Sequence, residues 1–116
     1  MKDFVKLFKA LSDETRMRIL KVLLERECCV CEVMQALDIS QSRASRNLGI
    51  LENAGFIKSR RDGLWIVYSI DEQTVHSYAP SLIGILRNSL VNEEVISQDR
   101  ERLSRAVRVG PRAIPK

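Results

Sequence analysis

Residues 40–70 read SQSRASRNLGILENAGFIKSRRDGLWIVYSI, and the first half of this stretch has the pattern of a capped helix. Ser40 is a suitable N-cap because its hydroxyl can accept a hydrogen bond from a backbone amide that has no partner at the start of a helix. The apolar residues that follow recur at the spacing of one helix face: Ala44, Leu48 and Leu51. Gly55 is a natural helix end. We therefore predict a helix from just after Ser40 to Gly55.

The second half of the stretch has the pattern of a β-hairpin. Residues 56–70 are rich in Ile, Val, Trp and Tyr, and Asp62-Gly63 interrupts them. An Asp-Gly pair between two such runs is a strong hairpin signal, because tight hairpin turns need residues with positive φ.

Three further helices are predicted upstream. Apolar residues recur at helical spacing in residues 3–10, 13–26 and 29–38, and Ser12 is the expected N-cap of the second helix. The third helix joins the capped helix through a turn of about three residues, which is typical of a helix-turn-helix. A hairpin directly after such a pair is the wing of a winged helix. The predicted fold is therefore mainly α with a β-hairpin wing, a winged helix-turn-helix.

The C-terminal third is predicted to hold one long helix and a basic segment. The helical period returns at Asp71 and carries an apolar face from Val75 to Leu90. Together with Phe4, Leu7 and Phe8, this face offers more apolar surface than one small core needs, which predicts a homodimer. Residues 97–116 hold six basic and two acidic side chains. We divide the chain into a DNA-binding and dimerisation domain, residues 1–96, and a basic C-terminal extension, residues 97–116.

Composition narrows the class of protein. The chain has 116 residues, of which 45% are hydrophobic and 29% charged, as in an ordinary globular domain. It has no apolar run long enough to span a bilayer and no secretory signal pattern, so we expect a cytoplasmic protein without a membrane partner. There is a single histidine and no phosphate-binding loop, GxSxG or HExxH motif. We therefore expect neither an enzyme nor an organic cofactor.

Polar and basic residues on the outer face of the capped helix indicate DNA binding. Arginine can pair with guanine edges through two hydrogen bonds, and serine can reach bases or phosphates. Two more arginines precede the hairpin tip, where they can meet backbone phosphate. The candidate residues for double-stranded operator DNA are Gln41, Ser42, Arg43, Ser45, Arg46, Arg60 and Arg61. The alternative is a solvated polar face on a dimeric interaction module that does not bind DNA.

The three cysteines lie together at positions 28, 29 and 31. A disulfide framework spaces its cysteines along the chain, so this cluster is not one. Clustered thiols in a reducing compartment suggest binding of a soft metal or redox chemistry, whereas the alternative is that they are buried small hydrophobic residues. A thiol oxidoreductase is disfavoured, because the chain has no CxxC motif and no βαβ pattern.

These segments resemble the ArsR/SmtB family of winged-helix repressors. LFKALSDETRMRILKVLL is similar to the N-terminal signature of that family, and residues 39–70 are similar to its recognition helix and wing. ECCVCEV resembles the sensor motif of its arsenic-responsive members. The resemblance implies a homodimer that represses its own operon and leaves DNA when an inducer binds.

The same resemblance implies which cysteines bind the inducer. Cys29 and Cys31 match the two cysteines of the CVC motif. Arsenic-responsive members often have a third cysteine three residues later, where this chain has Met34. Cys28 is an extra cysteine that can supply a third sulfur or be a bystander. Zinc-sensing members use histidines and carboxylates on the last helix, a set that His76 alone cannot build.

Helix geometry suggests a mechanism. Residues i and i+2 of a helix point about 200° apart, so Cys29 and Cys31 cannot hold one ion while their turn stays regular. Binding would then distort the helix that leads to the recognition helix, and DNA would be released. A site made only of thiolates is best suited to As(III) or Sb(III) as the inducer, and Cd(II) or Pb(II) is the competing choice. Oxidation of the neighbours Cys28 and Cys29 is a weaker alternative, a redox-responsive repressor.

Overall fold

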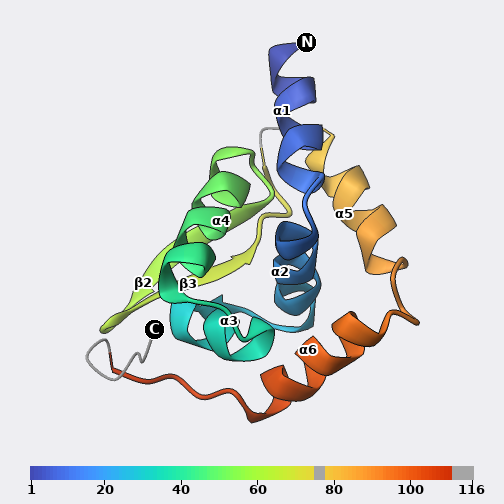
Figure 1. Ribbon diagram of the computed structural model, residues 1–116. Coiled ribbons are helices and arrows are strands. Elements are labelled where there is room, and N and C mark those ends of the chain that lie inside the picture. Colours follow the sequence, from blue (N-terminus) through green and yellow to red (C-terminus); the bar gives the residue numbers. More distant parts are fainter. Residues whose placement is uncertain (75–77, 111–116) are drawn as a thin grey trace.

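The computed structural model describes residues 1–74 and 78–110. Its helices are α1 (Lys2–Leu11), α2 (Glu14–Glu25), α3 (Val30–Leu37), α4 (Gln41–Asn53), α5 (Ala79–Arg87) and α6 (Glu94–Arg105). Its strands are β1 (Cys28–Cys29), β2 (Ile57–Asp62) and β3 (Trp65–Ile70). Figure 1 shows α2 near the centre, with α4 and the β2–β3 hairpin on one side and α5 on the other. None of the described helices combines the length and apolar character that crossing a bilayer requires.

The helix-turn-helix forms as the local sequence predicts. The Ser40 hydroxyl accepts a hydrogen bond from the amide of Arg43 at 3.2 Å and begins α4. Gly55 follows the helix with φ +91°, a left-handed conformation that glycine adopts without strain. The cap of α2 differs from the prediction by one residue. Asp13 rather than Ser12 accepts the hydrogen bond of the Arg16 amide, at 3.0 Å.

The wing is the predicted hairpin, but the sheet has a third strand. Asp62 pairs with Trp65, so Gly63 and Leu64 form the two-residue loop, and Gly63 has φ +62°. β1 pairs antiparallel with β3, in the strand order β1-β3-β2. Sequence analysis missed β1 because a strand of two residues has no periodicity. The predicted winged helix-turn-helix is confirmed.

The core lies where α2, α3 and α4 meet the sheet. The predicted inner face of α4 is confirmed, because Ala44, Leu48 and Leu51 are fully buried. Apolar side chains of α2 and the residues that enter the wing complete the centre: Ile19, Leu20, Phe56 and Ile57. Their burial removes apolar surface from water and fixes α4 and the wing on one rigid body.

The helix predicted to begin at Asp71 is wrong in its extent. α5 begins at Ala79, with Pro80 in its first turn, and ends at Arg87. Proline is tolerated in a first turn but breaks a helix interior, because it lacks an N–H and its ring clashes with the preceding turn. Leu90, the expected end of the helix, has φ +62° and lies in the loop that follows.

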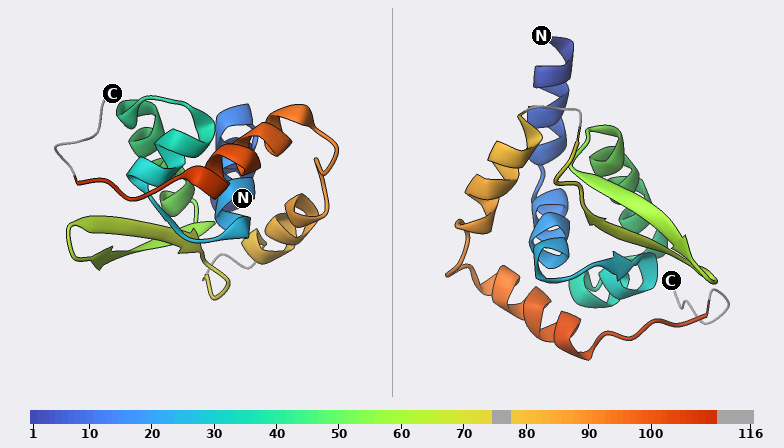
Figure 2. Two further views of the ribbon diagram at one scale, coloured as in Figure 1. Left: turned by 90° about the horizontal axis from the view of Figure 1, so that it is seen from below. Right: turned by 180° about the vertical axis from the view of Figure 1, so that it is seen from behind.

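The basic C-terminal segment contains a helix that sequence analysis did not predict. α6 packs across α2 and α3, and the boundary drawn between residues 96 and 97 falls within it. Asp99 is 1% exposed and accepts hydrogen bonds from Arg18 (2.8 Å from Nε and from Nη2) and Arg102 (2.8 Å). After α6 the chain runs past α3 to the wing (Figure 2).

Candidate functional site

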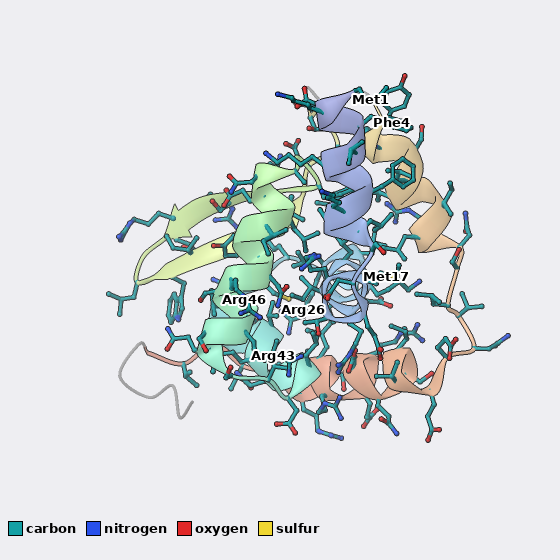
Figure 3. All side chains as sticks on the ribbon, turned by 45° about the horizontal axis from the view of Figure 1, so that its top comes forward. Met1, Phe4, Met17, Arg26, Arg43 and Arg46 are labelled. Carbon is teal, nitrogen blue, oxygen red and sulfur yellow. A yellow bond between two sulfur atoms is a disulfide. The ribbon has the colours of Figure 1, made fainter. Side chains whose placement is uncertain are left out.

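The outer face of α4 presents the predicted DNA-contacting residues to solvent. Gln41, Ser42, Arg43, Ser45 and Arg46 are all exposed, whereas the inner positions of the helix are buried. Figure 3 shows Arg43 and Arg46 on this helix. The exposed side chains have the polar and basic character that a major-groove contact needs.

These residues differ in the contacts that their side chains make within the protein. Arg43 donates a hydrogen bond through Nη2 to the Thr15 hydroxyl at 2.9 Å, and the Ser42 hydroxyl lies 3.3 Å from that of Ser40. Within the described part of the chain, Arg46 makes no hydrogen bond and no ion pair. Its guanidinium can therefore pair with a base or phosphate without breaking an internal contact.

The inner face of α4 is held by a polar pair that sequence analysis missed. Asn47 is 4% exposed, and its Oδ1 accepts a hydrogen bond from Arg16 Nη1 at 3.0 Å. Arg16 also donates to the carbonyls of Lys9 and Ala10 at the end of α1. This pair therefore joins α1, α2 and α4. The signal in the sequence was a polar residue at an inward position of an apolar helix face.

The two arginines of the wing are not equivalent. Arg60 forms an ion pair with Glu27 and lies 3.9 Å from an Asp62 oxygen. Arg61 is exposed and has no ion pair among the residues that the structure describes. Of the two wing arginines, Arg61 is thus the one whose charge is available to a phosphate.

The cysteine pair is assembled differently from the predicted helix site. Cys29 ends β1 and is the N-cap of α3, with extended backbone (φ −79°, ψ 172°), while Cys31 lies in the first turn of α3. The two sulfurs are joined in a disulfide, and the Cα atoms are 5.5 Å apart. The expectation that both cysteines lie on one helix and point apart is therefore wrong. The extended residue turns its sulfur toward Cys31, so no unwinding is needed to bring the two together.

Cys28 is separated from this pair. It is fully buried in the hydrophobic core, and its Sγ donates to the carbonyl of Arg26 at 3.5 Å. Alternation along a strand places neighbouring side chains on opposite faces, so Cys28 faces the core where Cys29 does not. Burial raises the pKa of the Cys28 thiol to about 12. Across residues 1–74 and 78–110, no three His, Cys, Asp or Glu side chains gather into a metal-binding group. His76 lies outside the described residues.

A buried carboxylate supports the start of α3. Glu32 Oε1 accepts the amide of Cys29 at 3.0 Å and Arg108 Nε at 3.3 Å, and Oε2 accepts Arg26 Nη1 at 2.6 Å. Burial opposes ionisation of Glu32, but the hydrogen bonds from Arg26, the Cys29 amide and Arg108 outweigh it and lower the pKa. Sequence analysis missed this role, although an acid at the third helical position is a known helix-start signal.

A cavity of about 160 Å³ lies beside the cysteine pair. Its walls include both cysteines, Gln41 of α4, and Leu64, Trp65 and Val109. The amide of Val109 donates to Cys31 Sγ at 3.5 Å. The sulfur pair therefore borders the first residue of α4, the tip of the wing and the C-terminal segment at once.

Comparisons with known proteins agree with this architecture. A profile described as "Bacterial regulatory protein, arsR family" matches residues 13–59. The arsenic resistance transcriptional regulator ArsR1 of Pseudomonas putida is 38% identical over 100 residues, which cover 84% of this chain and 74% of that protein. The cadmium resistance transcriptional regulatory protein CadC homolog of Staphylococcus aureus is 46% identical over 74 residues. That match covers 63% of this chain and 61% of the CadC homolog, so the chain spans about three fifths of its length.

A solved structure with the same fold is the homodimeric winged helix-turn-helix DNA-binding domain of Mb0332 from Mycobacterium bovis. It is 26% identical, with a TM-score of 0.65, and the match covers 74% of this chain and 76% of that chain. Both relatives above are named as transcriptional regulators, which confirms the expectation of a regulatory rather than an enzymatic protein. From the matched sequence, the shared fold and the exposed recognition helix, we conclude that the chain belongs to the ArsR family of bacterial regulatory proteins.

Proposed function

We propose that the protein is a cytoplasmic, metal(loid)-responsive transcriptional repressor that binds operator DNA as a homodimer. As(III) or Sb(III), bound by Cys29 and Cys31, would release it from DNA. The names of the relatives, which refer to arsenic and cadmium resistance, support this class of inducer.

The observation that carries the proposal is the position of the sulfur pair. The cavity beside Cys29 and Cys31 is lined by Gln41, the first residue of α4, and by Leu64 and Trp65 of the wing. A change at the sulfurs therefore acts directly on both elements that would contact DNA. An inducer that favours a different placement of these elements weakens DNA binding by its differential affinity for the two states.

The donor set fits a thiophilic ion held by two sulfurs. Once reduced, Cys29 and Cys31 place two thiols at the N-terminus of α3, where the helix dipole favours thiolates. As(III) would supply two covalent bonds to sulfur. Cys28 does not fit as a third ligand, because its sulfur is buried in the core and faces away from the pair. Water or hydroxide is left to complete the coordination.

Exposed apolar side chains support the homodimer. Phe4 and Phe8 on α1 are each 44% exposed, and the centre of the Phe4 ring lies 4.9 Å from that of Phe8 and 4.9 Å from that of Tyr78. Ile85 on α5 is exposed as well. Leu7, by contrast, is buried within the monomer. Pairing of α1 and α5 across a twofold axis would cover this surface and set two α4 helices for successive major grooves.

The test is operator binding by the reduced protein with and without arsenite, using the DNA directly upstream of its own gene. We expect arsenite to release the wild type but neither Cys29→Ser nor Cys31→Ser. Cys28→Ala is the matched control and should respond like the wild type. Equal release of all four proteins from DNA would exclude Cys29 and Cys31 as the arsenite-binding site. If the protein binds no duplex even at low salt, an interaction module that does not bind DNA is favoured instead.

A second candidate is a thiol-redox-responsive repressor, which the Cys29–Cys31 disulfide specifically favours. Closing this bond passes two electrons to an oxidant and releases two protons, and it differs from the Cys28–Cys29 pairing considered from sequence. A panel of arsenite, antimonite, Cd(II), Pb(II) and diamide in the operator assay separates the candidates. Release by Cd(II) or Pb(II) alone assigns a cadmium or lead sensor, and release by diamide alone assigns the redox sensor.

A further inference from the structure

The chain beyond α6 crosses the molecule from α3 to the tip of the wing. Residues 106–110, which we name the C-terminal strap, leave the end of α6 and pass along α3 toward the β2–β3 hairpin (Figures 1 and 2). This course places the strap over the cavity beside the cysteine pair, which Val109 helps to line.

The main chain of the strap forms hydrogen bonds with side chains of α3. Gln35 donates through Nε2 to the carbonyl of Val107 at 2.7 Å, and its Oε1 accepts the amide of Val107 at 3.1 Å. Two residues later, the amide of Val109 donates to Cys31 Sγ at 3.5 Å. A side-chain amide that satisfies both groups of one residue holds the backbone in place without requiring a particular side chain there.

The strap is fastened to the wing by side chains. The Trp65 indole donates to the carbonyl of Val109 at 2.8 Å. Arg108 bonds Asp62 of the wing at 2.8 Å and Glu32 of α3 at 3.3 Å, and its guanidinium lies 5.7 Å from the centre of the Trp65 ring. Arg108 thus bridges the wing and the helix that carries Cys31, with charge-assisted bonds on both sides.

We propose that the C-terminal strap is part of the sensor, closing the site over Cys29 and Cys31 and transmitting their chemical state to the wing. This inference rests on the proposed function, because it concerns regulation at the same sulfur pair. Cys31 Sγ accepts the hydrogen bond of Val109, and the Val109 carbonyl accepts that of Trp65, so one strap residue contacts both the sulfur and the wing. Displacement of the strap at Cys31 removes a contact that holds the wing tip.

Trp65 makes this testable because it is the only tryptophan of the chain. Its emission and its quenching by acrylamide report whether the strap covers the wing. The test variant is Arg108→Gln, which breaks the bridge to Asp62 and Glu32. The matched control is Arg105→Gln, which removes the same charge from an exposed ion pair with Glu101 on α6.

Two measurements decide the proposal in the full-length protein. First, we expect Arg108→Gln to speed modification of the reduced Cys29 and Cys31 thiols by a bulky disulfide reagent by roughly fivefold to thirtyfold, because the closed state loses its charge-assisted bonds. Second, oxidising the wild type with diamide or adding arsenite to its reduced form should change Trp65 emission. Arg108→Gln should lack most of that change, whereas Arg105→Gln should match the wild type in both measurements.

The outcomes separate this inference from the proposed function. If thiol reactivity and Trp65 emission are equal in Arg108→Gln, Arg105→Gln and the wild type, the proposal that the strap closes the site is refuted. A different result is that arsenite neither binds the wild type nor releases it from DNA, while diamide gives the expected thiol reactivity and Trp65 emission. That result refutes the proposed arsenite sensing and supports the coupling of the sulfur pair to the wing.

Discussion

Arg46→Ala should weaken specific operator binding and leave the fold intact. Arg46 is exposed on α4 and makes no hydrogen bond or ion pair within the described residues. Its loss therefore removes no internal contact, and the free energy of unfolding should change by no more than about 0.5 kcal/mol. Any large effect of the substitution must then come from the complex with DNA.

The size of that effect follows from the symmetry of the assembly. A bidentate arginine–guanine contact contributes about 1–3 kcal/mol of discrimination. In the proposed homodimer each α4 supplies one such contact, so two copies give about 2–6 kcal/mol, or roughly thirtyfold to twenty-thousandfold in Kd. A phosphate contact would behave differently, lowering the salt dependence of binding by about one per protomer with little effect on sequence preference.

Fluorescence anisotropy with the operator and with an unrelated duplex, at several salt concentrations, measures both effects. Arg105→Ala is the control, because it removes the same charge from an exposed pair with Glu101 that is far from α4 in the chain. Equal affinity losses for Arg46→Ala and Arg105→Ala would refute the assignment of Arg46 to the DNA-contacting face. An unchanged Kd for Arg46→Ala would do the same.

Three further substitutions test the surroundings of the site. Asp99→Ala should destabilise the fold by about 3–5 kcal/mol in denaturant unfolding, because it leaves the guanidinium of Arg18 without its buried partner; an equally stable variant would contradict this role. Cys28→Ala should cost about 1 kcal/mol of stability and keep arsenite affinity in ultraviolet titration, whereas a loss of more than roughly tenfold would make Cys28 a ligand. The pKa of Glu32 is lowered in the folded state, so the stability it contributes is present above its unfolded pKa and is lost as pH falls through the folded value. Thermal unfolding of the wild type should therefore drop between roughly pH 5 and pH 3 more steeply than that of Glu32→Gln, and parallel curves would contradict this.

Local signals in the sequence were sufficient for the helix-turn-helix and the wing. The Ser40 cap, the Gly55 stop and the hairpin turn depend on residues within a few positions of each other. The cap and the stop occur as predicted, whereas the two-residue turn is Gly63-Leu64, one position after the predicted Asp62-Gly63 pair, and Asp62 stays in β2. The inner face of α4 followed from periodicity, because a helix must turn its apolar residues toward the core. The errors at α2 and α5 were local as well, since Asp13 competed with Ser12 as a cap and Pro80 was overlooked as a helix start.

The candidate site was only partly predictable. The resemblance to the family's CVC motif singled out Cys29 and Cys31, but the geometry predicted for them was wrong. β1 forms only by pairing with β3, with Cys28 opposite Tyr68 and Cys29 opposite Val67. That pairing gives Cys29 an extended backbone and turns Cys28 into the core. No local pattern shows such a strand, because its stability comes from a partner far along the chain.

The sequence by itself determined the first four helices and the hairpin in their order, together with the exposed face of α4, and it made Cys29 and Cys31 the candidate ligands of a thiophilic ion. Only the tertiary structure decided that the sulfurs of Cys29 and Cys31 meet and that Cys28 is excluded. It also decided that α6 and the C-terminal strap belong to the same body. The physical reason is separation along the chain, since the bonds of Arg18 to Asp99 and of Gln35 to Val107 join residues 81 and 72 positions apart. Caps and turns are encoded within a few residues, whereas such contacts exist only once the core has folded.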